Sequence, residues 1–191
     1  MRGNAEPTLR NSAGHTWHVW DRAVRLLHWA LVGSVALSAV GLVALAGVHR
    51  PAGYVALAVV ALRVVLGFCG SRYARFAQFV HMPRATWRYA RAVLGGREPR
   101  FIGHNPLGGW MALALMACVA ALARTGWLYT TDAFWGDETV ERVHRALAWT
   151  LLGLVVAHVF GVIFTSLRHR ENLVAAMWSG AKRAPERNDI A

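Results

Sequence analysis

The chain has 191 residues, of which 55% are hydrophobic and only 16% are charged, and its mean hydropathy is positive. Soluble domains carry about 25% charged residues, so this composition favours a single integral-membrane domain over residues 1–191. The formal net charge is +11 and comes almost entirely from arginine. Because the arginines cluster between apolar segments, membrane topology explains them better than nucleic-acid binding, and no nucleic-acid partner is expected.

Four apolar segments follow one another along the chain, at residues 23–46, 52–68, 107–128 and 143–165. Each is close to the roughly 20 residues that a helix needs to span a bilayer. Asp21 is a candidate N-cap for the first segment, and Pro51 and Pro106 stand at favourable helix-start positions before the second and third. The sequence therefore predicts an all-α membrane protein built as a bundle of four transmembrane helices.

The loops between these segments differ sharply in charge, and this difference predicts the orientation. Basic residues gather before the first span, between the second and third, and after the fourth: Arg2, Arg10, Arg22 and Arg25; Arg72, Arg75, Arg84, Arg88, Arg91, Arg97 and Arg100; Arg168, Arg170, Lys182, Arg183 and Arg187. The opposite side has only Arg50 in a very short hairpin, and a loop in which acidic residues offset two arginines: Asp132, Asp137, Glu138 and Glu141 against Arg142 and Arg145. The positive-inside rule places both termini in the cytoplasm of a bacterium, with the protein in the inner membrane.

Two segments outside the spans carry further expectations. Residues 76–94 mix arginines with aromatic and aliphatic side chains, which predicts an amphipathic stretch lying along the cytoplasmic interface of the membrane. The last ten or so residues are polar, and we expect them to form a disordered tail.

Four histidines occur at spacings that suit membrane helices. His144 and His158 are 14 residues apart in one apolar segment, which places them on the same helix face and about 21 Å apart along its axis. In the predicted topology His49 shares the depth of His144, and His28 shares the depth of His158. This arrangement predicts two bis-histidine haem irons stacked across the bilayer, with all four histidines as metal ligands. The alternatives are structural histidines and a zinc site, and the gap of about 21 Å does not allow one four-ligand zinc centre.

Four more residues are candidates for cofactor binding. Arg63 inside the second span and Arg124 near the end of the third are candidate partners of haem propionates, or side chains that reach back to the interface. His104 is expected to cap the third helix, to bond a propionate, or to line a quinone pocket, and Asn105 beside it is a second quinone contact. There is no CxxCH motif, so the haems are expected to be non-covalent haem b.

Several stretches in order along the chain carry a family resemblance. They are Val19-Trp20-Asp21-Arg22, Arg25-Leu26-Leu27-His28-Trp29, His49-Arg50-Pro51-Ala52-Gly53-Tyr54, Gly70-Ser71-Arg72-Tyr73-Ala74-Arg75-Phe76, Gly103-His104-Asn105-Pro106, Thr125-Gly126-Trp127 and Arg170-Glu171-Asn172-Leu173. Together with His144 and His158, this set resembles the bacterial cytochrome b-561 family, which includes the di-haem cytochrome b subunits of nickel–iron hydrogenases. The resemblance implies a four-helix bundle with two b haems, whose ligands carry over to the same four histidines.

The function expected from these features is transmembrane electron transfer between the quinone pool and a periplasmic redox protein, either a c-type cytochrome or a hydrogenase-like oxidoreductase. Quinone is expected to exchange at the cytoplasmic haem. Two alternatives remain open at this point: a superoxide:quinone oxidoreductase on the same fold, and a cofactor-free membrane assembly subunit. The bilayer is a partner in every case, and the sequence leaves open a homo-oligomer.

Overall fold

The computed structural model describes residues 16–44 and 47–190. Its elements, in chain order, are β1 (Thr16–His18), α1 (Arg22–Val43), α2 (His49–Cys69), α3 (Phe76–Phe79), α4 (Pro83–Leu94), α5 (Pro106–Leu128), α6 (Glu138–Arg168), α7 (Leu173–Ser179) and β2 (Ala181–Arg183). Four of the helices, α1, α2, α5 and α6, are long and apolar enough to cross a membrane. The predicted four-helix membrane bundle is therefore confirmed.

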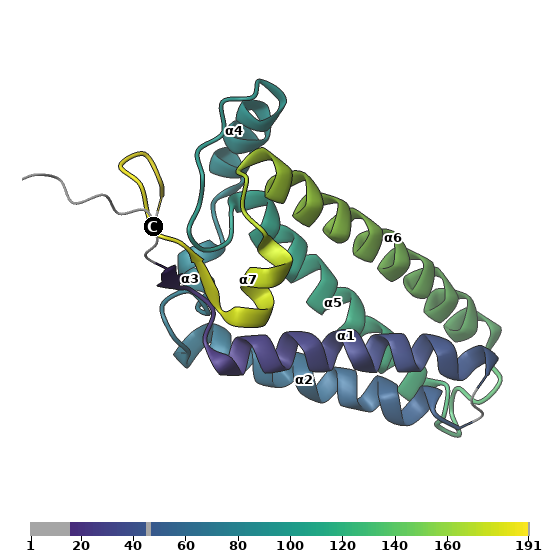
Figure 1. Cartoon of the computed structure of the whole chain (residues 1–191). Coiled ribbons are helices and arrows are strands. Elements are labelled where there is room, and N and C mark those ends of the chain that lie inside the picture. The colour runs from purple at the N-terminus through teal and green to yellow at the C-terminus, as the bar shows by residue number, and fades with distance from the viewer. Residues whose placement is uncertain (1–15, 45–46, 191) are drawn as a thin grey trace, which may run out of the picture.

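The two ends of the bundle differ. The connections from α1 to α2 and from α5 to α6 lie at one end, which we call the loop end (Figure 1). The strands and the short helices α3, α4 and α7 lie at the other, which we call the capped end. Helix α1 packs along α2, α2 packs against α5, and α5 packs along α6. Helix α6 is inclined to α1 in the view of Figure 1.

Side chains fix where the helices begin, because the first amides of a helix have no partner within it. The carboxylate of Asp21 accepts a hydrogen bond from the amide of Val24 at 2.8 Å, as expected for an N-cap. Asp137 caps α6 in the same way. Helix α6 has 31 residues, more than the predicted span 143–165, because its polar first turns continue the helix beyond the apolar segment. The predicted interfacial segment 76–94 is divided into α3 and α4, with Pro83 at the start of α4.

A buried ionic cluster at the capped end holds the C-terminal segment in place. Arg100 pairs with Glu171 at 2.6 Å and also with Asp189, and its side chain donates to the carbonyl of Arg183 at 2.9 Å. Lys182 lies 4.0 Å from Glu171. Burial alone would raise the pKa of Glu171, but Arg100 and Lys182 outweigh burial and hold that pKa below its usual range.

The expectation of a disordered C-terminal tail is wrong. Besides the ion pair of Asp189, the amide of Ile190 donates to the carbonyl of Arg100 at 2.9 Å, and the amide of Ile102 donates to the carbonyl of Ile190 at the same distance. The partners lie some 90 residues earlier in the chain, so the local polarity of the tail could not reveal them.

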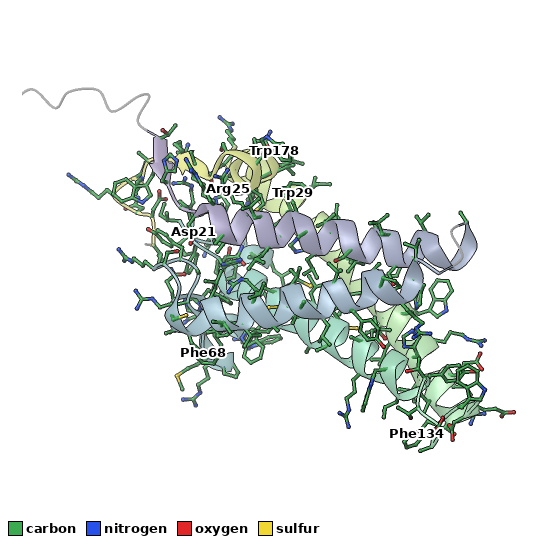
Figure 2. All side chains as sticks on the ribbon, turned by 90° about the horizontal axis from the view of Figure 1, so that it is seen from below. Asp21, Arg25, Trp29, Phe68, Phe134 and Trp178 are labelled. Atoms are coloured by element: carbon green, nitrogen blue, oxygen red, sulfur yellow. The ribbon has the colours of Figure 1, made fainter. Side chains whose placement is uncertain are left out.

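The same segment is fastened to the start of α1. Strand β2 pairs antiparallel with β1, and Figure 2 shows Trp178 of α7 beside Arg25 and Trp29 of α1. Arg25 donates to the carbonyl of Trp178, and the Trp29 and Trp178 rings meet edge to face at 5.6 Å. Gly180 ends α7 at φ 85°, where a Cβ would lie 2.6 Å from the carbonyl oxygen of Trp20. A glycine is required here by both conformation and space.

We predict that Glu171→Gln loosens the C-terminal segment. Removing one charge from a buried ion pair costs about 3 kcal/mol, because Arg100 and Lys182 lose their shared partner. The measurement is the rate of tryptic cleavage after Arg183 and Arg187 in the folded protein, which is expected to rise at least tenfold. A comparable loosening is expected in the unchanged protein as the pH falls below the ordinary pKa of a glutamate and through the lowered pKa of Glu171, and pepsin, which works at acid pH where trypsin does not, would report it.

Glu138→Gln is the matched control, because its pair with Arg142 on α6 is exposed and 3.8 Å long. Exposed pairs contribute little to stability, so cleavage should not change. Equal cleavage rates in the Glu171→Gln and unchanged proteins would contradict the fastening role of this cluster.

Candidate functional site

The structure brings the four candidate histidines together in two pairs. His28 of α1 faces His158 of α6 with ring centres 6.5 Å apart, and His49 of α2 faces His144 of α6 with ring centres 6.1 Å apart. Helix α6 thus contributes one histidine to each pair. The pairs are the ones that share a depth in the predicted topology.

The spacing within each pair suits a metal ion between the rings. A metal–imidazole bond is about 2 Å long and the ring centre lies roughly 1 Å behind the bonded nitrogen, so two rings on opposite sides of one ion have centres about 6 Å apart. Directly hydrogen-bonded imidazoles would be about 5 Å apart between centres. Within residues 16–44 and 47–190, no group of three or more histidine, cysteine or acidic side chains could hold a metal. Two ligands per centre are what an iron already held by four porphyrin nitrogens takes, so the residues present fit a haem.

Hydrogen bonds orient both histidines of the loop-end pair. The Nδ1 of His49 lies 2.9 Å from the carbonyl oxygen of Ser38. The Nδ1 of His144 lies 2.9 Å from Oγ1 of Thr125, whose own proton goes to the carbonyl of Ala121 or Leu122, each at 3.0 Å. Since both acceptors require a proton on Nδ1, the inferred tautomer leaves Nε2 of each ring free to bind a metal.

Ser38 and Thr125 were missed as site residues by the sequence analysis. Both are small polar residues in apolar spans, and this feature of the sequence could have indicated a role at the site. Whether such a side chain faces a histidine of another helix depends on the rotation of both helices. Gly126 also belongs to this arrangement, because a Cβ there would lie 3.3 Å from Cε1 of His144.

The surroundings of the capped-end pair are positively charged instead. The guanidinium carbon of Arg63 lies 5.6 Å from the centre of the Phe79 ring, and His104 packs against the rings of Trp20 and Phe79 with centres 4.7 Å away in each case. Nη1 of Arg63 and Nδ1 of His104 are buried and have no hydrogen-bond partner among the described residues. Burial, reinforced by the positive charges of Arg63 and Lys182, lowers the pKa of His104 to about 3. This cluster fits an anionic group that supplies hydrogen-bond acceptors.

Two of the remaining candidates have other positions. Asn105, and not His104, caps α5: its side-chain oxygen accepts a hydrogen bond from the amide of Gly108 at 2.7 Å. Arg124 is exposed and lies near the loop end of α5. The structure therefore gathers Arg63 and His104 at the capped end and leaves Arg124 apart.

Three glycines of the spans face open space. A Cβ on Gly33 of α1, or on Gly153 or Gly161 of α6, would meet nothing within 4 Å. Gly41 differs, because a Cβ there would lie 2.7 Å from the backbone nitrogen of His49, where α1 and α2 approach closely. At 100° per residue, Gly161 lies within about 60° of His158 on α6, whereas Gly33 and Gly153 point well away from the histidine faces.

Comparisons with known proteins give a family and one relative. The family model of the prokaryotic cytochrome b561 matches residues 19–180. The chain is also 25% identical over 169 residues to the protein named "Probable Ni/Fe-hydrogenase B-type cytochrome subunit" of Rhizobium leguminosarum bv. viciae, covering 74% of this chain and 70% of that protein. No solved structure matches the chain significantly.

We predict that Thr125→Val weakens metal binding by the loop-end pair, because it removes the acceptor that orients His144. Losing such an orienting partner lowers metal affinity about 10- to 100-fold. The measurement is haem content and the reduced-minus-oxidised spectrum of protein purified in detergent. Thr125→Ser keeps the hydroxyl and is expected to behave like the unchanged protein, so equal loss of haem from both variants would contradict the orienting role.

Proposed function

The chain belongs to the prokaryotic cytochrome b561 family of membrane electron-transfer proteins, and from this premise we propose that it moves electrons across the bilayer through two non-covalent b haems. His49 and His144 are the proposed ligands of one iron, and His28 and His158 of the other. The spacing of the ring centres, 6.1 and 6.5 Å, is the observation that carries the proposal. An iron with two imidazole ligands can take up and release one electron without an open coordination position, which suits electron transfer better than oxygen chemistry.

The residues around each proposed iron have different tasks. At the loop end, Ser38 and Thr125 hold the two imidazoles in one tautomer and one orientation. At the capped end, Arg63 is the proposed partner of the haem propionates, because its buried Nη1 has no partner among the described residues. An exposed Arg124 is a weaker candidate for the same task at the loop end. Gly161, near the face of His158 on α6, has open space at its Cβ position and would let a macrocycle lie close to that helix.

The redox partners follow from the orientation that the arginines favour. With the capped end in the cytoplasm of a bacterial inner membrane, the loop end faces the periplasm, where a c-type cytochrome or a hydrogenase-like oxidoreductase exchanges electrons with the nearer haem. The hydrogenase cytochrome subunit among the relatives supports a partner of this class. Quinone is the proposed partner at the capped end. There the imidazole of His104 is neutral and its Nδ1 has no hydrogen-bond partner among the described residues, so it could give one hydrogen bond to a quinone carbonyl.

We predict two low-spin b haems per chain. His49→Ala or His144→Ala should remove the haem of the loop end and spare the other, whereas His28→Ala or His158→Ala should do the reverse. The measurement is a pyridine haemochrome count with a redox titration of each variant. One haem or none in the unchanged protein, or loss of the same haem in His28→Ala and His144→Ala, would overturn the assignment.

We also predict that His104→Leu keeps both haems and slows quinone reduction. Loss of one hydrogen bond to the bound quinone corresponds to about 1–3 kcal/mol, or roughly 5- to 150-fold in the rate constant divided by KM. His104→Gln retains a donor and should restore much of the rate. Unchanged quinone kinetics in His104→Leu would place the quinone at the loop end instead, near Trp127, Tyr129 and Trp135.

A further inference from the structure

An apolar groove lies between α4 and the first turns of α5, away from both histidine pairs. Its volume is about 440 Å³, and its walls are formed by Pro83, Thr86, Trp87, Ala90, Leu107 and Trp110. The indole nitrogen of Trp110 donates to the carbonyl of His81 at 3.1 Å, which fixes one wall. Trp87 and Trp110 are 62% and 41% exposed. Since α5 spans the membrane and begins here, the groove lies at the level where the hydrocarbon core meets the headgroups.

Helix α4 has three distinct faces. At 100° per residue, Pro83, Thr86, Trp87 and Ala90 share the face toward the groove. Tyr89 lies on a second face, which is buried and packs its ring against Phe101 at 5.4 Å.

The third face of α4 is basic and adjoins the groove. It consists of Arg84, Arg88 and Arg91, which are all exposed. The guanidinium carbon of Arg91 lies 5.3 Å from the centre of the Trp87 ring, so positive charge borders the apolar wall directly. No ion pair joins any of the three to an acidic side chain in the part of the chain that the structure describes.

We propose that this groove is a binding site for one anionic phospholipid. An acyl chain lies between Trp87 and Trp110, and the phosphate meets the basic face of α4. The groove and its border match the two parts of such a lipid. The apolar wall suits a hydrocarbon chain, and the guanidinium groups along its edge can bind a phosphate through two hydrogen bonds each. A free phosphate would leave the apolar wall uncovered, and a quinone would leave the arginines unpaired. The bound lipid would hold α4 against α5, close to His104.

The test uses the holoprotein in detergent, mixed with equal amounts of phosphatidylglycerol and phosphatidylcholine of identical acyl chains. Native mass spectrometry counts the lipids that stay bound. One phosphatidylglycerol per chain, preferred at least tenfold over phosphatidylcholine, is the expected result. Arg84→Gln/Arg88→Gln/Arg91→Gln should abolish the preference, and Ala90→Phe, which fills the groove, should abolish retention of the lipid itself.

The control variant is Arg72→Gln/Arg75→Gln/Arg187→Gln, which removes the same charge from exposed positions at the same end and should keep the preference. Haem spectra check that every variant is folded. Equal retention of the two lipids by the unchanged protein, or equal loss in the control variant, would overturn the proposal. So would displacement of the lipid by excess inorganic phosphate, which marks a general anion site, or a retained mass that corresponds to quinone.

Discussion

Helix α6 carries one histidine toward each end of the bundle, and the rest of the structure depends on the distance at which these side chains are held from α1 and α2. Both ring pairs are near 6 Å, too far for a direct hydrogen bond between imidazoles and suited to one ion between them. Helix α6 does not reach this position by packing on α1. It packs along α5, which in turn contacts α2, so the spacing is set through the neighbouring helices. A substitution on α5 that changes its packing can therefore alter the spacing of the histidines at both proposed centres.

The two ends keep this spacing by different means. At the loop end the histidines are held individually, by the carbonyl of Ser38 and the hydroxyl of Thr125. At the capped end the strands and α7 fasten the start of α1 to the C-terminal segment through Arg25 and the buried pair of Arg100 with Glu171. The loop end thus holds its two imidazoles in one orientation. The capped end combines a backbone fastened to the C-terminal segment with an excess of positive charge.

The sequence predicts those features that depend on one helix at a time. Continuous apolar runs predict four spans, and the distance of 14 residues between His144 and His158 predicts two depths on one face. Asn105 before Pro106 also follows the ordinary pattern of a helix start, although the sequence analysis offered His104 for that position. The pairing of histidines from different helices was also predicted, because it depends only on their depth in the membrane, but features that depend on how helices are rotated or how distant segments dock were missed. The docking of Asp189 on Arg100 and the contact of Thr125 with His144 both require the relative placement of helices, which composition and periodicity do not contain.

The contrast between two neighbouring groups of charges at the capped end bears on what the protein binds. Arg100, Glu171 and Asp189 form a matched set in which every buried charge has a partner. Arg63 and His104 have buried donors without a partner among the described residues. An unpaired buried donor costs about 1–3 kcal/mol, and folded proteins pair more than about nine in ten of them. Because the chain pairs Arg100, Glu171 and Asp189 so fully, the free donors of Arg63 and His104 are best explained by a hydrogen-bond acceptor that the chain itself does not supply. In the proposed function, a carboxylate of a bound group would meet this need, because Arg63 and His104 both lie at the end of the bundle that holds His28 and His158.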